Sequence, residues 1–422
     1  MATANGVKIT TACRSCRSRK LDLILSLGEL HISTFLEKDQ LSIGKVPLKL
    51  ILCRNCSLLQ LRHTVSSEKL YRQYWYSSGV NNTMRKELAD IARRAVSKCA
   101  LKPGDFVIDI GSNDSTLLRS YPVKDVKLVG FEPSYNLVAD AQGQGLTIIN
   151  NFFNSNDWRK RFGDAKAKII TAIAMFYDLD NPDAFVADIV KVLDPNGIFV
   201  IQMSYLSSML SQNAYDNTCH EHLCYYSLSS LETILKRHGL EVFDVVLNDT
   251  NGGSFRVYIH HQGDSRKIAR RVQELRDSEK KLNLHRKKIY DDFTARVFAL
   301  REKLYSFVAS KVRKGKKVYV YGASTKGNTL LQFCKLDSRL VKAAADRNPS
   351  KWGKKTVSTL IPIISEEQAR QEKPDYFLVL PWHFLKEFVQ REKKYLNSGG
   401  KFIVPLPRFR VIGKKEARVL MK

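Results

Sequence analysis

Short apolar runs alternate with longer amphipathic segments over residues 101–262 of this 422-residue chain. The runs are rich in β-branched and aromatic residues and are bounded by Gly, Asn, Asp and Pro, a pattern typical of buried strands that alternate with helices. The predicted helices include 182–193 and 229–238, and the predicted strands cover 107–110, 128–131, 147–149, 169–174, 198–203, 241–247 and 255–259. This order predicts an α/β fold with a doubly wound sheet.

The first predicted strand runs into a turn suited to ligand binding. Residues 106–118 read as a buried strand, a tight turn and the start of a helix. Gly111 lets the backbone approach a ligand closely, and the free N–H groups of the helix would favour a polar group. The next strand ends at Glu132, where a carboxylate can accept hydrogen bonds from ribose hydroxyls. An ordinary turn capped by Asn and Asp is the alternative.

The residues of this turn argue against a dinucleotide. Asn113 and Thr116 stand where a G-x-G-x-x-G site has its second and third glycines. Asp109 and Asp114 would repel a pyrophosphate, but they suit a ligand that carries an amino group and a sulfonium. We therefore predict S-adenosylmethionine (SAM), with Asp109 or Asp114 near its methionyl end and Glu132 on its ribose.

Four of the eight cysteines form two C-x-x-C pairs near the start of the chain. Cys13, Cys16, Cys53 and Cys56 together offer the four thiolates of a closed, structural Zn²⁺ site. A redox pair or disulfides are the alternatives. The isolated thiols are expected to be small buried side chains, namely Cys99, Cys219, Cys224 and Cys334.

Two further segments carry candidate chemistry. Residues 71–85 combine tyrosines with a Ser-Ser-Gly sequence ahead of a predicted helix, which favours a pocket wall over a domain linker. Residues 216–227 follow the fifth predicted strand and contain His220, Glu221 and His222. A neutral histidine can take a proton and a neighbouring carboxylate can orient its ring, whereas the spacing is weak for a metal site. Hydrogen-bonded structural residues are the alternative.

The last third of the chain predicts a helical connector and another α/β unit. Residues 264–312 contain neither Pro nor Gly and are expected to be helical. A strand then leads into a Gly-rich turn with Lys326, which would form a phosphate cradle for a nucleotide diphosphate, although the Walker A order is absent. A plain turn with a solvated lysine is the alternative.

The formal net charge of +27 is uneven. Residues 101–250 are net acidic, whereas residues 251–422 hold 40 Lys and Arg against 16 Asp and Glu. The basic part would attract a nucleotide or a nucleic acid, unless it is only a solvated surface. Because no apolar run reaches 18 residues and no basic-then-apolar segment opens the chain, we expect no membrane span, no secretory signal and a cytoplasmic location.

These pieces, in this order, resemble the SAM-dependent sugar C-methyltransferases of deoxysugar biosynthesis, which act on nucleotide-linked 4-keto sugars. The resemblance spans nearly the whole chain. Its landmarks are the four cysteines, residues 76–85, Asp109 to Asp114, Phe131 to Ser134, His220 to Ser227, Asn251 to Ser254, Tyr321 to Thr329 and Leu380 to His383.

The resemblance implies a class I methyltransferase, Rossmann-like sheet flanked by a small zinc module and a C-terminal Rossmann-like domain. The implied parts are a zinc module (1–75), a SAM domain (76–262), a helical connector (263–312) and a nucleotide-binding domain (313–422). The implied SAM-binding residues are Ser78, Gly79, Asp109, Gly111, Ser112, Asn113, Asp114, Glu132 and Pro133. The implied substrate-binding residues are Tyr76, Met84, His220, Tyr225, Tyr226, Tyr321, Gly322, Ala323, Lys326, Asn328 and Arg347.

The resemblance also implies a reaction. His222, oriented by Glu221, would remove the proton on the carbon next to the substrate ketone, and the enolate carbon would attack the SAM methyl group. Tyr76 and Cys219 complete the implied catalytic set. A nucleotide-linked sugar is then the expected partner, rather than a nucleic acid or a membrane, with a monomer or dimer as the oligomeric state.

Two positions depart from the family pattern. Ser115 replaces the usual glycine after Gly-Ser-Asn-Asp, and Cys219 replaces a tyrosine before His-Glu-His. The missing tyrosine is a candidate partner for the ketone oxygen, and a thiol is a poorer donor. Two alternatives therefore stay open, an RNA-directed methyltransferase and a catalytically idle SAM-binding relative.

Overall fold

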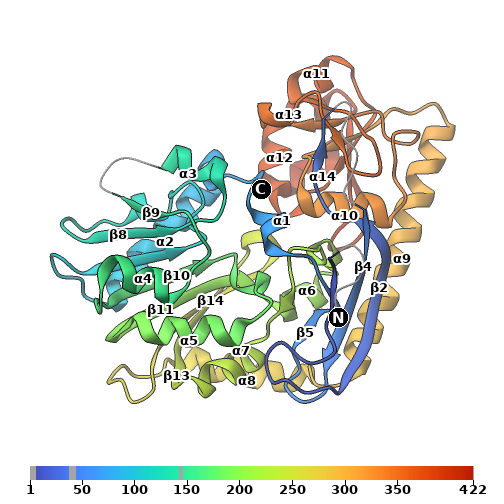
Figure 1. Ribbon diagram of the computed structural model, residues 1–422. Coiled ribbons are helices and arrows are strands. Elements are labelled where there is room, and N and C mark those ends of the chain that lie inside the picture. Colours follow the sequence, from blue (N-terminus) through green and yellow to red (C-terminus); the bar gives the residue numbers. More distant parts are fainter. Residues whose placement is uncertain (1–5, 38–43, 142–145, 422) are drawn as a thin grey trace.

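The central part of the chain forms a seven-stranded sheet in the computed structural model, which describes residues 6–37, 44–141 and 146–421 (Figure 1). The strand order is β13-β14-β11-β10-β7-β8-β9, and β14 is antiparallel to both of its neighbours. The strands are β7 (Phe106–Ile110), β8 (Lys127–Phe131), β9 (Thr147–Ile149), β10 (Ala167–Ile173), β11 (Leu193–Ser204), β13 (Leu240–Asn248) and β14 (Ser254–His261). All seven predicted strands are present, and their order confirms the class I methyltransferase layout.

Alternation along the strands places apolar side chains on both faces of this sheet. Val107 and Ile169 pack with helix α2 on one face, whereas Ile108 and Ile170 belong to the larger core on the other. The helices of this part are α2 (Asn82–Lys98), α3 (Tyr135–Ala141), α4 (Ser155–Phe162), α5 (Pro182–Val192), α6 (Leu206–Ser211) and α7 (Leu228–Arg237). The predicted helices at 182–193 and 229–238 are thus confirmed to within one residue.

The helix predicted directly after the turn at residues 111–117 was wrong. Only a single 3-10 turn, η2 (Leu118–Ser120), follows β7. Asn113 and Ser115 adopt left-handed backbone angles, with φ of 53° and 62°, which an α-helix cannot contain. The side chain of Asp114 also accepts hydrogen bonds from the N–H and hydroxyl of Thr116 at 3.1 and 2.6 Å. The local hydrogen bonds of this turn therefore compete successfully with a helix.

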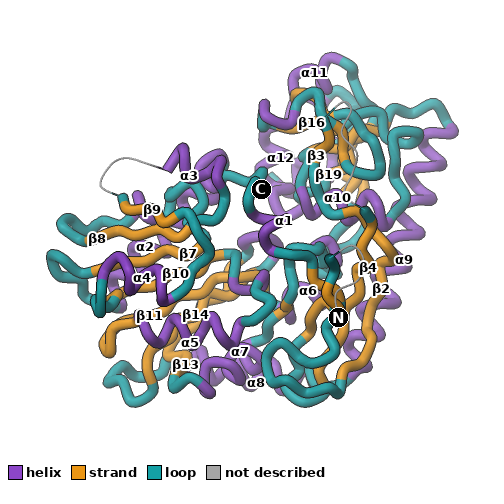
Figure 2. The backbone as a smooth tube through the Cα atoms, in the orientation of Figure 1, coloured by secondary structure: helices purple, strands orange, loops and turns teal. Residues whose placement is uncertain are grey.

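The N-terminal residues do not form a separate unit. Their four-stranded sheet has the order β12-β5-β4-β2, and its edge strand β12 (Cys224–Tyr225) comes from the central part of the chain. The long β2–β4 pair lies along helix α9 (Figure 2). The remaining elements here are β1 (Lys8–Ile9), β2 (Leu21–His31), β3 (Phe35–Leu36), β4 (Lys45–Cys53), β5 (Leu59–Leu61), β6 (His63–Thr64), α1 (Ser67–Tyr71) and η1 (Ser78–Val80).

The helical connector is two helices, α8 (Arg270–Leu282) and α9 (Lys287–Arg313), separated where Asn283 takes a left-handed conformation. Beyond it lies a six-stranded sheet of order β18-β16-β15-β19-β20-β21. Its elements are β15 (Val318–Tyr321), α10 (Thr325–Phe333), β16 (Ala344–Asp346), β18 (Ile363–Ser365), α11 (Glu366–Gln371), β19 (Tyr376–Val379), α12 (Leu385–Arg391), α13 (Lys393–Asn397), β20 (Lys401–Val404), β21 (Arg410–Ile412) and α14 (Lys414–Leu420). None of the helices in the described ranges combines the length and the apolarity that crossing a bilayer requires.

The central and C-terminal parts of the chain contact each other at a glycine. Gly252 has a φ of +86°, and a Cβ built on it would lie 2.8 Å from the Trp382 ring. The Trp382 indole N–H donates to Asp216 Oδ2 at 3.0 Å. Short strands β3 and β17 (Lys355–Thr356) also pair N-terminal with C-terminal residues. These contacts hold the C-terminal sheet against the carboxyl ends of the central strands.

Candidate active site

A cavity of about 670 Å³ lies at the carboxyl ends of β7, β8 and β10 and is shared by three parts of the chain. The N-terminal residues contribute Thr64 and Ser66 to its wall, and the C-terminal domain contributes Thr325 and Lys326. It brings together thirteen of the predicted site residues: Tyr76, Ser78, Met84, Asp109, Gly111, Ser112, Asn113, Glu132, Pro133, Cys219, Glu221, His222 and Lys326. Open α/β sheets bind ligands at this edge.

Glu132 is buried and lines the cavity. Its Oε2 accepts the backbone N–H of Asn113 at 2.7 Å, and its Oε1 accepts that of Ser134 at 2.9 Å. Both oxygens keep a free lone pair for a further donor, such as a ribose hydroxyl. Gly130 is needed beneath them, because a Cβ there would lie 2.5 Å from Ser112 Oγ. That buried hydroxyl has no hydrogen-bond partner among the described residues.

Asp109 adds a second buried carboxyl group near Glu132. Its Oδ1 accepts the hydroxyl of Thr171 at 2.7 Å. Burial raises the pKa of Asp109 to about 7, with a further contribution from the charge of Glu132. A cationic ligand would favour the charged form of this carboxyl. Two acidic groups and an unpartnered hydroxyl therefore fit SAM, which presents ribose hydroxyls, an amino group and a sulfonium.

Asp114 does not line the cavity, contrary to the prediction that it contacts the ligand. Its Oδ2 accepts the hydroxyl of Ser77 at 2.5 Å and the N–H of Gly79 at 2.6 Å. A Cβ on Gly79 would lie 2.9 Å from that oxygen, which explains the glycine. Asp114 and Gly79 thus fix the segment of Tyr76 and Ser78, which forms the pocket wall that the sequence predicted.

His222 also lines the cavity. Its Nδ1 lies 2.9 Å from the backbone oxygen of Asn217, and its ring lies 4.3 Å from that of Tyr177, centroid to centroid. A carbonyl oxygen can only accept, so Nδ1 carries the proton and Nε2 keeps its lone pair. Burial, and then the charge of Lys326, lowers the pKa of His222 to about 3. The imidazole is therefore neutral near pH 7 and can accept a proton.

Glu221 does not orient His222 as predicted, because Asn217 takes the Nδ1 hydrogen bond instead. The Glu221 side chain is buried, and its Oε2 has no partner among the described residues. Burial raises the pKa of this carboxyl. Burial likewise raises the pKa of the Cys219 thiol well above its ordinary value. Both groups are thus biased toward their neutral forms.

The sequence analysis missed Asp178, which lines the cavity close to Glu221. Burial and the charge of Glu221 raise its pKa well above the ordinary value, and its Oδ1 has no partner among the residues that the structure describes. The available signal was its position: it follows β10, and the strand ends of this fold bind ligands.

Ten predicted residues lie outside the cavity lining. Besides Asp114 and Gly79, these are His220, Tyr225, Tyr226, Tyr321, Gly322, Ala323, Asn328 and Arg347. Most are used elsewhere: His220 Nε2 lies 3.1 Å from Val46 O, Tyr225 donates to Asn217 O at 3.2 Å, and Tyr321 donates to Glu392 at 2.8 Å.

The predicted phosphate cradle after β15 is largely closed. The backbone N–H of Gly322 donates to Ala345 O, and that of Ala323 to Asp346 Oδ2, both at 2.8 Å. The N–H groups of Gly327 and Asn328 donate to Ser324, as expected of a capped helix. A turn whose amides are already bonded offers few donors to a phosphate.

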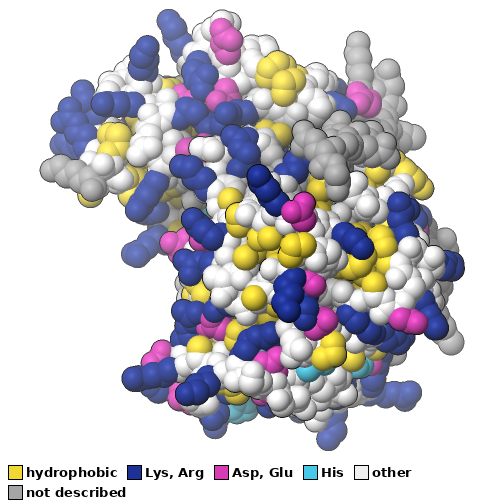
Figure 3. All heavy atoms as spheres, turned by 90° about the vertical axis from the view of Figure 1, so that its left-hand side faces the viewer, with side chains coloured by type: hydrophobic (Ala, Val, Ile, Leu, Met, Phe, Trp, Pro, Cys, Tyr) yellow, Lys and Arg dark blue, Asp and Glu magenta, His cyan; other side chains and the backbone are white. Residues whose placement is uncertain are grey.

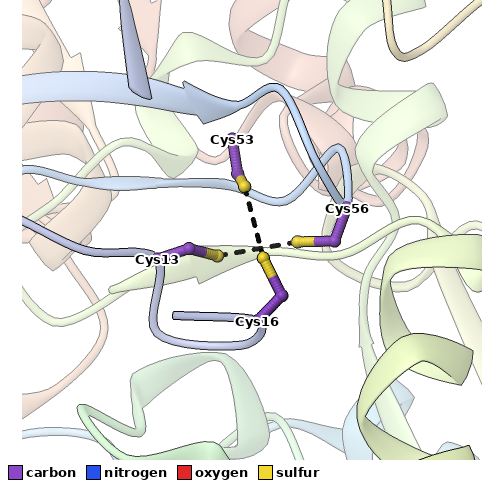
Figure 4. Close-up of side chains that lie close together, drawn as sticks. All are labelled: Cys13, Cys16, Cys53 and Cys56. Carbon is purple, nitrogen blue, oxygen red and sulfur yellow. Dashed lines mark hydrogen bonds between the residues drawn. The ribbon is translucent and has the colours of Figure 1, made fainter. Parts of the chain in front are cut away.

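The four cysteines of the two C-x-x-C pairs converge as predicted (Figure 4). The Sγ atoms of Cys13 and Cys56 are 3.6 Å apart, those of Cys16 and Cys53 are 3.5 Å apart, and all four lie within 4.8 Å of one another. A tetrahedral site with Zn–S bonds of about 2.3 Å has S–S edges of about 3.8 Å, so the cluster fits Zn²⁺. The distances are too long for disulfides, and the cysteines are free.

The basic residues of the chain are spread over the surface. Figure 3 shows Lys and Arg side chains over the upper and lower parts of one face, with Asp and Glu among them. Many are ion-paired, as in the Arg270–Glu274 and Lys288–Asp292 pairs at 2.9 and 2.5 Å.

Comparison with known proteins matches three family models along the chain. Residues 13–71 match a "Putative zinc binding domain", residues 80–245 a "Methyltransferase domain" and residues 249–407 a "C-methyltransferase C-terminal domain". The chain is 30% identical over 406 residues to C-methyltransferase NovU of Streptomyces niveus, which covers 95% of this chain and 96% of the relative.

Solved structures resemble a smaller part of the chain. One is a SAM-dependent methyltransferase of Clostridium acetobutylicum, with a TM-score of 0.33, 14% identity and coverage of 42% of this chain and 92% of the other. Another is magnesium protoporphyrin IX methyltransferase of Synechocystis with bound SAM, with a TM-score of 0.32, 12% identity and coverage of 42% and 79%.

Proposed function

Because the chain belongs to the C-methyltransferase family, as a SAM-dependent enzyme with a structural zinc site, we propose that it methylates the carbon next to the ketone of a nucleotide-linked 4-keto-deoxysugar. The observation that carries the proposal is the position of a neutral His222 in the cavity that also contains Asp109 and Glu132. A proton acceptor and the predicted SAM-binding residues line one cavity, where they can act on the same substrate.

His222 is the proposed base. The ketone acidifies the neighbouring C–H bond, and Nε2 holds the lone pair that takes the proton. Asn217 fixes the tautomer through Nδ1, and Tyr177 packs against the ring. Glu132, Asp109 and Ser112 bind SAM, which supplies the methyl group.

In this proposal the substrate lies in the cavity between His222 and the residues that are predicted to bind SAM. Tyr76 from the segment before α2, Met84 from the first turn of α2, and Thr325 and Lys326 of the C-terminal domain all line the cavity. The choice of a 4-keto nucleotide sugar rests on the sequence resemblance to the sugar C-methyltransferases. The need for an acidic C–H next to a carbonyl rests on the histidine.

Mass spectrometry tests this function. A panel of nucleotide-linked 4-keto-deoxysugars is incubated with the protein in D2O, with and without SAM. We expect a SAM-dependent mass gain of one methylene on one panel member, and deuterium uptake at the α carbon in the absence of SAM. Neither change on any member would contradict the proposal. A salt-dependent affinity for RNA would then favour an RNA substrate.

A further inference from the structure

One lysine of the C-terminal domain reaches the active-site cavity. Lys326 lies in the first turn of α10, after the N-cap Ser324, whose hydroxyl accepts the N–H of Gly327 at 3.0 Å. The Lys326 amino group donates to Asn217 Oδ1 at 2.5 Å, across 109 positions of sequence. Its side chain lines the cavity together with Cys219, Glu221 and His222.

Among the residues that the structure describes, no carboxylate lies within ion-pair distance of Lys326, although three buried carboxyl groups face it. Of the two lysines that line the cavity among the described residues, Lys8 is paired with Asp180 at 2.8 Å. Lys326 forms no ion pair with a residue that the structure describes. Burial raises the pKa of each carboxyl that faces it, which favours their neutral forms; these are Asp178, Asp216 and Glu221. The cavity is therefore suited to receive a negative charge beside Lys326.

Asn217 connects this lysine to the base. Its backbone oxygen accepts from His222 Nδ1 and its side-chain oxygen accepts from Lys326 Nζ. A positive charge so close to His222 opposes formation of the imidazolium. Such an arrangement favours proton removal only if negative charge develops next to the lysine in the same step. The oxygen of an enolate is such a charge.

We propose that the Lys326 ammonium group donates a hydrogen bond to the ketone oxygen of the substrate and stabilises the enolate oxygen that forms when His222 removes the α proton. The C–H electron pair moves toward the carbonyl, the oxygen takes the negative charge, and the lysine keeps its proton. When the α carbon attacks the methyl group of SAM, the carbonyl re-forms, the methyl–sulfur bond breaks and its electron pair stays on the sulfur of S-adenosylhomocysteine. The imidazolium then releases its proton to solvent. This role rests on the proposed function.

The role differs from the phosphate contact that the Gly-rich turn predicted. The amides of that turn are already hydrogen-bonded, and the lysine points to Asn217 instead. It also accounts for Cys219, since an ammonium donor makes a phenol or thiol at that position dispensable. Preorganised donors at a developing oxyanion are worth about 10² to 10³-fold in kcat.

Lys326→Met tests the role, with Lys335→Met as the control, an exposed lysine in the turn just beyond the end of the same helix. The readouts are kcat and KM on the keto sugar that the wild type methylates, α-proton exchange in D2O, and affinity for the nucleoside diphosphate without the sugar. We expect kcat and exchange to fall about 10² to 10³-fold, with less than about a threefold change in diphosphate affinity. Lys326→Arg should recover part of the loss, and Cys219→Ala should lose less exchange than Lys326→Met does.

Two results overturn the role. One is a weakened diphosphate affinity and a raised KM with unchanged kcat, which would make Lys326 a phosphate contact. The other is a larger loss of exchange in Cys219→Ala than in Lys326→Met, which would assign the oxygen to the thiol. Proton exchange in the wild type distinguishes failure of this inference from failure of the proposed function on which it rests. Full exchange in both wild type and Lys326→Met overturns only the lysine role, whereas no exchange in the wild type overturns the proposed function as well.

Discussion

The Nδ1 atom of His222 lies 2.9 Å from the backbone carbonyl oxygen of Asn217. This contact fixes the imidazole tautomer without a carboxylate. A carbonyl oxygen accepts a hydrogen bond but is not protonated at neutral pH, so the proton stays on Nδ1. The base is thus oriented by the main chain, whereas Oε2 of the neighbouring Glu221 has no hydrogen-bond partner among the described residues. Amino-acid substitutions and the pH dependence of the reaction should test this arrangement independently.

His222→Ala should lower α-proton exchange and methyl transfer by about 10² to 10⁴-fold, the usual contribution of a positioned base. The measurements are exchange in D2O by mass spectrometry and SAM affinity by calorimetry. SAM affinity should stay near the wild-type value, because His222 is not among the residues predicted to bind SAM. Normal exchange in this variant would exclude His222 as the base.

The pH profile of kcat/KM should lack a histidine limb near 6.5. The pKa of His222 in the free protein is lowered to about 3, so the base is already deprotonated throughout the range from about pH 5 to 8. Protonation would remove the base only as the pH falls toward that lowered value. Because protonation of Asp109, whose pKa is about 7, would weaken SAM binding in the same range, the profile is measured at saturating SAM. A tenfold decrease in kcat/KM for the sugar per pH unit below 6.5 would then show instead that His222 titrates as an exposed histidine does.

Glu132→Gln should weaken SAM binding by about 10 to 100-fold. The carboxylate accepts two backbone N–H groups, and an amide nitrogen in place of one oxygen leaves one donor unsatisfied, at a cost of about 1.5 to 3 kcal/mol. Calorimetric titration with SAM measures the change. Glu274→Gln on the exposed face of α8 is the control and should bind SAM as the wild type does. Equal affinities in both variants would contradict the assignment of Glu132.

Cys13→Ser should release zinc and lower the melting temperature by more than about 10 °C, because the metal binding free energy stabilises the folded N-terminal sheet. Elemental analysis and calorimetry measure the two effects. Cys99→Ser is the matched control, since its thiol faces Lys168 O at 3.4 Å and lies outside the cluster. Retention of one zinc per chain in Cys13→Ser would contradict the four-cysteine site.

Some of the fold was predictable because it depends on local periodicity. Short apolar runs such as the one that contains Val107 and Ile108 predicted the strands, and the alternation of strands with helices predicted a doubly wound sheet. The turn after β7 was not predictable in the same way. Its helix was lost because Asn113, Asp114 and Ser115 form local hydrogen bonds and left-handed angles that a propensity pattern does not reveal.

The sequence by itself determined the elements whose physical cause is local: the strands, the glycine-containing turn and the two C-x-x-C pairs, whose spacing presents thiolates from tight turns. Only the tertiary structure decided which polar side chains meet. Asp114 bonds to Gly79, Asn217 bonds to both His222 and Lys326, and Asp178 joins the cavity wall. Such contacts cross up to 109 positions, and they depend on how two sheets pack and on which donors burial leaves unsatisfied.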